Sequence, residues 1–319
     1  MKERARELLS IWNGIWFEPV STAPLAVFRI AFGLVSLGWA LSLLPEISAF
    51  FTKGSILPHQ PNYSGKLSGA WGLLGIFHSE GAAIGLVTLM IIASICLTLG
   101  LFSQLAAAVV FLALLSFQRR NPFVVNSGDV LMRVLAFYLI FAPTSAALSL
   151  DRFLRHRKDF WRFPARAPWA MRLLQIQFSA VYLFAVWAKV RGTTWNNGTA
   201  VSFAFRITDI ARFPVPSFIT HSLLISNLLT FGTLAVELSL ALLVWNRKLR
   251  PWILLAGLGL HLGIEYAIRV CFYGLAILSL YLIWIPSERI ETAMVALRSR
   301  LARGPGAKLA SATAPSARA

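Results

Sequence analysis

The sequence predicts an all-α membrane protein: a polytopic transmembrane helical bundle of about eight spans. Residues 82–102 carry no charged side chain, and an uncharged apolar run of this length is typical of a helix that crosses a bilayer. Apolar residues make up 57% of the chain and charged residues only 13%, against about 25% charged residues in soluble domains. The apolar runs are continuous and not alternating, so they predict helices and exclude a membrane β-barrel.

Eight apolar stretches define the expected spans. Pro24 and Pro45 bound the first, because proline is tolerated in the first turn of a helix and the residue before a proline is disfavoured in helical conformation. The division of the last apolar region into two helices rests on Glu265 and Arg269, which interrupt it. The expected spans are residues 25–44, 82–102, 103–117, 129–148, 169–190, 223–245, 252–268 and 271–285.

The two ends of the chain differ from this central domain, residues 25–286. Residues 1–24 mix charged with large apolar side chains and lack a small-residue cleavage site, so we expect an amphipathic helix on the membrane surface and a lead-in, not a signal peptide. Residues 287–319 are basic and become rich in Ala, Ser, Pro and Gly. This composition predicts a largely disordered tail.

Charge distribution in the loops predicts the orientation. Residues 150–172 hold seven basic and two acidic residues, residues 246–251 hold three basic residues and no acid, and the segment after Pro286 holds six basic and two acidic residues. With eight spans these regions lie on one side, which the positive-inside bias assigns to the cytoplasm together with both termini. We therefore expect a multi-pass protein of a bacterial plasma membrane. Topology also explains the net charge of +17, so nucleic acid is not an expected partner.

Several motif classes are absent from the sequence. His261 and Glu265 would supply only two metal ligands on one helix, the remaining histidines lie in loops or at span ends, and no zinc-binding spacing occurs. We expect no metal site. The phosphate-binding and dinucleotide fingerprints and the serine or cysteine nucleophile motifs are also missing. Cys96 and Cys271 fall within apolar segments and are expected to be small buried hydrophobes.

Ionisable residues inside the spans are the candidates for function, since each costs roughly 2.5–3.5 kcal/mol at a helix centre. Asp129 and Arg133 are four residues apart, so they share a helix face and can form an ion pair, which is the structural alternative to a catalytic role. His261, Glu265 and Arg269 also follow one another at intervals of four residues, so they would form one polar ridge along a helix. The full set is Arg29, Asp129, Arg133, Lys189, Glu237, His261, Glu265 and Arg269.

Three of these residues differ in what their positions imply. Arg29 lies near a helix end and can snorkel to the interface. Glu237 lies in the middle of a span without a partner four residues away, so it needs a donor from another helix, a proton or water. Lys189 ends a span at the expected outer face. Desolvation there can leave a neutral amine, which is a general base; the alternative is an interfacial anchor beside Trp187 and Trp195.

Five segments of the sequence resemble the HTTM family, the membrane domain shared with vitamin K-dependent γ-glutamyl carboxylase. The resemblance covers about residues 15–286, with the matching segments in the family's order. These segments are FEPVSTAPLAVFRIAFGLVSL (17–37), NSGDVLMRVLAFYLIFAPTSAALSLDR (126–152), IQFSAVYLFAVWAKVRGTTWNNGTA (176–200), GTLAVELSLALLVW (232–245) and LHLGIEYAI (260–268).

The resemblance implies a quinol as cofactor and a role for particular residues. Lys189 matches the lysine proposed to deprotonate vitamin K hydroquinone in the carboxylase, and His261 matches a histidine of a late span. Where the carboxylase has an Asn-His pair, this chain reads Asn126-Ser127-Gly128-Asp129. Asp129 is the residue that could replace the missing histidine. The carboxylase also continues into a large lumenal domain that holds its peptide substrate, which these 319 residues do not include.

Two function hypotheses follow from these observations. In the first, the chain is a quinol-linked oxidoreductase or carboxylase-like enzyme acting on a peptide or small molecule. In the second, it is a non-catalytic carrier or partner-binding scaffold within the lipid bilayer. The enzyme hypothesis requires Lys189, His261 and Glu237 to converge on one outward-opening cavity. It assigns catalysis to Lys189, His261 and Asp129, and the cavity lining to Arg29, Asn126, Arg133, Trp187, Trp195, Glu237 and Glu265.

Overall fold

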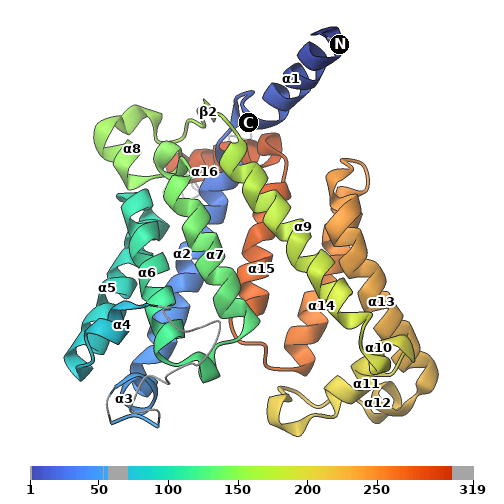
Figure 1. Ribbon diagram of the computed structural model, residues 1–319. Helices are drawn as coiled ribbons and strands as arrows, with labels where there is room; N and C mark the ends of the chain where they lie inside the picture. Colours follow the sequence, from blue (N-terminus) through green and yellow to red (C-terminus); the bar gives the residue numbers. More distant parts are fainter. Residues whose placement is uncertain (1, 53, 57–70, 304–319) are drawn as a thin grey trace, which may run out of the picture.

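In the computed structural model, which describes residues 2–52, 54–56 and 71–303, long helices run back and forth between the two ends of the molecule (Figure 1). The α-helices and strands are α1 (Lys2–Trp16), β1 (Val20–Ser21), α2 (Ala23–Leu43), α3 (Ile47–Phe51), α4 (Leu73–Ile76), α5 (Glu80–Leu99), α6 (Ser103–Arg120), α7 (Ser127–Phe141), α8 (Leu150–Arg155), β2 (Ala165–Arg166), α9 (Trp169–Lys189), α10 (Thr193–Asn196), α11 (Ala200–Phe205), α12 (Ser217–His221), α13 (Leu223–Leu242), α14 (Arg250–Ala267), α15 (Tyr273–Tyr281) and α16 (Ser287–Arg303). The 3₁₀ turns are η1 (Leu44–Glu46), η2 (Pro122–Val124), η3 (Thr144–Ala146), η4 (Arg157–Asp159), η5 (Thr208–Ile210), η6 (Leu243–Trp245) and η7 (Leu282–Trp284).

Each of the expected apolar stretches contains one of these helices. Within the described part of the chain, four helical segments are long and apolar enough to cross a bilayer, and the apolar segment Tyr273–Trp284 is shorter. The four are Ala23–Phe51, Glu80–Leu99, Trp169–Lys189 and Leu223–Trp245. The helices α6, α7 and α14 occupy the remaining stretches.

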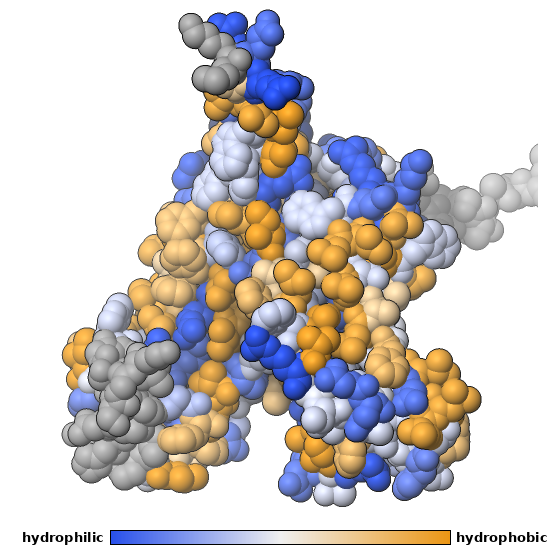
Figure 2. All heavy atoms as spheres, turned by 45° about the vertical axis from the view of Figure 1, so that its right-hand side comes forward, coloured by the Kyte–Doolittle hydropathy of each residue, from blue (hydrophilic) through white to orange (hydrophobic). Residues whose placement is uncertain are grey.

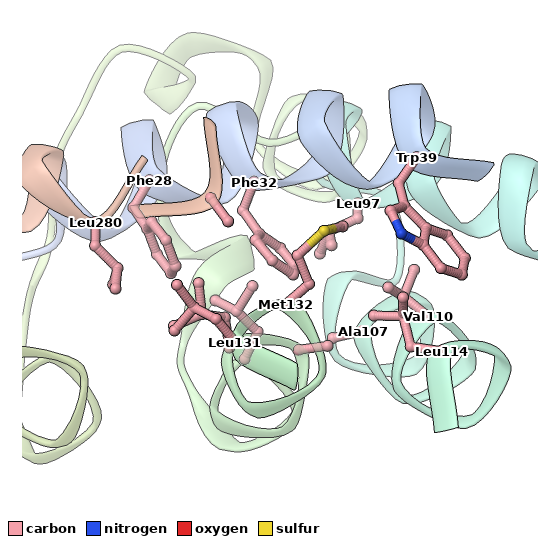
Figure 3. Packing of buried hydrophobic residues seen from close by; sticks show 14 of the residues in the cluster. Phe28, Phe32, Trp39, Leu97, Ala107, Val110, Leu114, Leu131, Met132 and Leu280 are labelled. Carbon is pink, nitrogen blue, oxygen red and sulfur yellow. The ribbon is translucent and has the colours of Figure 1, made fainter. Parts of the chain in front are cut away.

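The core of the bundle forms around α2, which brings large aromatic side chains into the interior. Phe28, Phe32 and Trp39 are buried along one side of this helix. Figure 3 shows them facing side chains of the neighbouring helices, among them Met132 of α7 and Leu280 of α15. Because α15 approaches α2 here, the last apolar helix packs against the first and closes the bundle.

A short two-stranded sheet ties distant parts of the chain together at one end of the bundle. β1 and β2 pair antiparallel, with Val20 opposite Arg166 and Ser21 opposite Ala165. The Ser21 hydroxyl also donates to a carboxylate oxygen of Glu291 in α16 at 2.5 Å. The lead-in to α2, the basic segment before α9 and the helix after the last span therefore lie at the same end (Figure 1).

The chain termini agree with the sequence only in part. The N-terminal helix occurs as α1 and exposes Leu8, Ile11 and Trp12; its contact with a membrane surface stays a prediction. Residues 287–303, the first part of the expected tail, form α16. The contact of Ser21 with Glu291 ties the first half of this helix to β1. Residues 304–319, where disorder was also expected, lie outside the described residues.

Arg29 is a fully buried charge, and the expectation that it snorkels or lines a cavity is wrong. Its guanidinium donates to the backbone carbonyls of Thr144 at 2.9 Å and Leu148 at 2.6 Å, in the turn after α7. The side chain is 0% exposed. Gly100, which ends α5 with φ +73°, makes room for it, since a Cβ there would overlap the guanidinium. Arg29 thus holds an irregular turn whose carbonyls would otherwise lack donors.

Replacing Arg29 by Met should lower the free energy of unfolding by about 3 kcal/mol, because each buried carbonyl left without a donor costs about 1–3 kcal/mol. Chemical unfolding in detergent micelles measures this loss. Arg133→Met is the matched control: Arg133 lies in α7 and makes no hydrogen bond or ion pair with the described residues, so its loss should change stability by less than about 1 kcal/mol. Equal losses in the two variants would contradict the role given to Arg29.

Candidate functional site

A cavity of about 940 Å³ opens between the two halves of the bundle, at the end opposite the β1–β2 sheet. Figure 2 shows the molecule hollowed at this end, between two lobes. The walls come from α7, α9, α10, α11, α13, α14, the start of α15 and the loop before it, and they are mainly apolar. The polar and aromatic side chains that reach it include Asn126, Gln177, Lys189, Trp195, Glu237, His261, Arg269 and Tyr273.

Lys189 and Glu237 form an ion pair in the wall of this cavity. The Lys189 Nζ atom donates to both carboxylate oxygens of Glu237, at 2.6 and 2.7 Å. The lysine side chain is 23% exposed and the glutamate side chain 8%. Lys189 is the last residue of α9 and Glu237 lies in the middle of α13, so the donor that Glu237 needed comes from a neighbouring helix. The Trp195 ring lies 5.3 Å from Nζ and adds a cation–π contact.

This pair can exchange a proton internally. The Lys189 ammonium and the Glu237 carboxylate neutralise each other's charge at this distance. Transfer of a proton from Nζ to a carboxylate oxygen gives a neutral amine and a carboxylic acid at the same place. The pair has then gained no proton overall, and it can accept one proton from a group bound in the cavity to become an ammonium beside a carboxylic acid.

His261 contributes an imidazole to the same cavity from α14. Its Nε2 atom lies 2.7 Å from the hydroxyl oxygen of Tyr182 in α9. Gly259 and Gly263 also line the cavity, and a Cβ added at either would meet no atom within 4 Å. These glycines leave α14 without side chains at the two positions, so neither position fills the cavity.

Asn126 and Asp129 together cap the start of α7, and only Asn126 lines the large cavity. The Asn126 side chain accepts hydrogen bonds from the backbone of Gly128 and Asp129. Asp129 accepts from the Asn126 backbone at 2.9 Å and from Trp39 Nε1 at 2.7 Å. One carboxylate oxygen of Asp129 therefore holds α7 against α2, and the other caps the start of α7. Asp129 lines a smaller cavity of about 210 Å³ on that side, away from Lys189.

Asp129 and Arg133 do not form the expected ion pair within the part of the chain that is described. Their spacing allows the pair, but Trp39 and the helix cap already satisfy the carboxylate. Arg133 does not line the large cavity. Arg133 was expected to line the cavity and Asp129 to be catalytic. The structure corrects both assignments, because neither residue lines the large cavity.

Trp187 and Glu265 also lie away from the cavity lining. Trp187 is 56% exposed and stacks with the Arg191 guanidinium at 4.3 Å. Glu265 pairs with Arg212 at 3.0 Å, which ties α14 to the segment between α11 and α12. The expected polar ridge on α14 is broken because the helix ends at Ala267, before the third member of the series. Trp195, in contrast, lines the cavity as expected.

Tyr182, Tyr273 and Tyr281 surround His261 and were not singled out from the sequence. Tyrosine in an apolar span resembles an interfacial or core residue, so its type alone gives no signal. One signal was present: Tyr182 and Lys189 are seven residues apart, which places them on the same face of α9. Cys271 was expected to be buried and is exposed at the cavity, with φ +52°, because it lies in the loop before α15. Among the described residues no cluster of three or more potential metal ligands occurs.

Comparison with known proteins identifies the family. The HTTM domain model matches residues 17–288. The chain belongs to the HTTM domain family. HTTM membership and the apolar helices together make it a membrane protein related to the vitamin K-dependent carboxylase family. No curated protein and no solved structure gave a significant match.

A double-mutant cycle on Lys189 and Glu237 should show strong coupling. Lys189→Met and Glu237→Gln should each lower the free energy of unfolding by about 2 kcal/mol, below the range of 3–5 kcal/mol for fully buried pairs because the ammonium is partly exposed. The double variant should lose less than the sum of the two, since no unpaired charge remains. Unfolding in detergent micelles gives the three values, and additive losses would show that the two groups do not interact.

Proposed function

We propose that this HTTM protein binds a quinol in the large cavity and that the Lys189–Glu237 pair moves a proton to or from its hydroxyl group. The observation that carries the proposal is the convergence of Lys189, Glu237 and His261, which come from three different helices, on one mainly apolar cavity. A scaffold protein would need each buried charge only to pair with a neighbour. It would not need the three groups beside open space.

The cavity fits the general shape and chemistry of such a ligand. Its volume of about 940 Å³ lies within the range of roughly 300–1,000 Å³ of small-molecule sites. Apolar walls suit a flat ring that partitions from lipid, and the indole of Trp195 offers a surface for stacking. A bound quinol would supply acidic hydroxyl groups and a redox-active ring. The groups that would hold it are the Lys189 amine and the His261 imidazole.

The protein's part in the reaction is a proton transfer at Lys189 Nζ and a carboxylate oxygen of Glu237. Lys189 passes one proton from Nζ to a carboxylate oxygen of Glu237, and the neutral amine then takes a proton from a hydroxyl group in the cavity. The pair gains one proton in total, and its net charge changes from zero to +1. The ammonium that results lies beside the oxygen that lost the proton and stabilises its negative charge.

We further propose eight spans, with both termini in the cytoplasm of a bacterial cell and the cavity open toward the outer face. The β1–β2 pairing supports this topology, because it brings residues 20–21 and 165–166 to one end and so requires an even number of crossings between them. Helices α2, α5, α6 and α7 supply four. The Ser21–Glu291 contact brings α16 to the same end, so the number of crossings between β2 and α16 must also be even. These four crossings are α9, α13, α14 and α15. The basic segments lie at this end, as the positive-inside bias demands.

A test of the ligand is to identify quinones that copurify with the protein. Extraction in mild detergent followed by mass spectrometry should find a quinone with the wild-type chain. Gly263→Phe places a ring in the cavity and should reduce the bound amount about tenfold, as expected for a loss of about 1.4 kcal/mol. Gly232→Phe is the control, because Gly232 is equally free of close neighbours and does not line the cavity. Equal quinone content in all three proteins would contradict the proposal.

Labelling of single cysteines tests the topology. In a chain without its two native cysteines, Asp209→Cys should react with a membrane-impermeant maleimide added to intact cells. Arg155→Cys should react only after lysis, because it lies at the end that carries the basic segments. Both side chains are exposed, so access alone does not distinguish them. Reaction of both residues from the same side would rule out this arrangement.

A further inference from the structure

A chain of hydrogen bonds leads from His261 into the interior of the bundle. The hydroxyl oxygen of Tyr182 lies 2.7 Å from His261 Nε2 and 3.0 Å from the hydroxyl oxygen of Tyr281. These groups come from α9, α14 and α15, and all three side chains are buried. Phe178 packs edge-on against both tyrosine rings, with centroids 5.0 and 5.4 Å apart. Gly257 faces the end of the chain, where a Cβ would overlap the Tyr281 hydroxyl.

The direction of the hydrogen bonds follows from counting donors. Within the described residues, the Tyr281 hydroxyl has Tyr182 as its only hydrogen-bond partner. If His261 donated from Nε2 to Tyr182, Tyr182 would donate to Tyr281, and the Tyr281 hydrogen would remain buried without an acceptor. Leaving a buried hydroxyl hydrogen without an acceptor is costly in free energy. In the opposite order Tyr281 donates to Tyr182 and Tyr182 donates to Nε2, so both hydroxyl hydrogens have an acceptor.

This order determines the proton position on the imidazole. Nε2 accepts a hydrogen bond, so a neutral His261 carries its hydrogen on Nδ1. Among the described residues Nδ1 has no hydrogen-bond partner, and His261 lines the cavity. Nδ1–H is therefore the group that His261 has left to offer a ligand. The Lys189 ammonium is the second donor in the same wall.

We propose that Tyr182 is a positioning residue that fixes His261 as an Nδ1–H donor, and that the cavity selects a ligand presenting a hydrogen-bond acceptor oxygen, such as a carbonyl or a phenolate. This inference rests on the proposed function for the presence of a ligand, but the tautomer is a property of the free protein. It assigns His261 to binding and stabilising an oxygen, and leaves proton acceptance to the Lys189–Glu237 pair.

Nitrogen NMR of ¹⁵N-histidine-labelled protein in nanodiscs tests the tautomer directly. The His261 signals are assigned by their loss in His261→Asn. The wild-type protein should show a protonated Nδ1 and an unprotonated Nε2, and the opposite tautomer or an imidazolium would overturn the proposal. Tyr182→Phe removes the donor to Nε2 and should produce a mixture of tautomers. Tyr281→Phe leaves that donor in place and should keep the wild-type signals. A wild-type signature in Tyr182→Phe would also overturn it.

Binding of menadione, a naphthoquinone with two carbonyl oxygens, tests the consequence for the ligand. His261→Asn keeps an N–H group near the position of Nδ1, whereas His261→Gln places its amide near Nε2. Menadione affinity, followed through tryptophan fluorescence, should fall about tenfold in the Gln variant and much less in the Asn variant. Equal affinity in the two variants would overturn the acceptor-oxygen proposal. A wild-type protein that bound no menadione would count against the proposed function, while the NMR result would still decide the tautomer.

Discussion

The ion pair of Lys189 with Glu237 is the interaction on which the account of this protein depends. A carboxylate in the middle of an apolar helix is costly unless another helix neutralises it, and the bidentate contact with Lys189 does so. The same contact fixes the end of α9 against α13. It also leaves the ammonium at the edge of a cavity and not in a closed core, which makes the pair available to a ligand.

The buried ionisable residues of this bundle fall into two groups, which differ in their hydrogen-bond partners and in their access to the cavity. Arg29 and Asp129 are held by backbone carbonyls, a helix cap and an indole N–H. These contacts use the fixed groups of neighbouring turns, so both residues organise the packing of α2 and α7. Lys189, Glu237 and His261 instead face open space. An ionisable residue inside a membrane domain is therefore a functional candidate only when its contacts leave part of it free.

Much of the helical architecture was predictable from the sequence, because uncharged apolar runs such as residues 82–102 specify helices by length and composition alone. Lys189, Glu237 and His261 were identifiable as unusual for the same reason. Their partners were not, because periodicity describes neighbours on one helix and not contacts between helices. Asp129 and Arg133 have the spacing of an ion pair, yet Trp39, 90 residues earlier in the chain, takes the carboxylate. Tyr182 was missed because its importance lies in a hydrogen bond to a residue 79 positions away.

The most direct test of the central claim is photoaffinity labelling of the protein in nanodiscs with a photoreactive naphthoquinone, with the adducts located by peptide mass spectrometry. We expect adducts on cavity-lining residues of α9, α11 and α14, in the neighbourhood of Lys189 and His261. Adducts confined to lipid-facing side chains of helices such as α5, with none in the cavity, would contradict it.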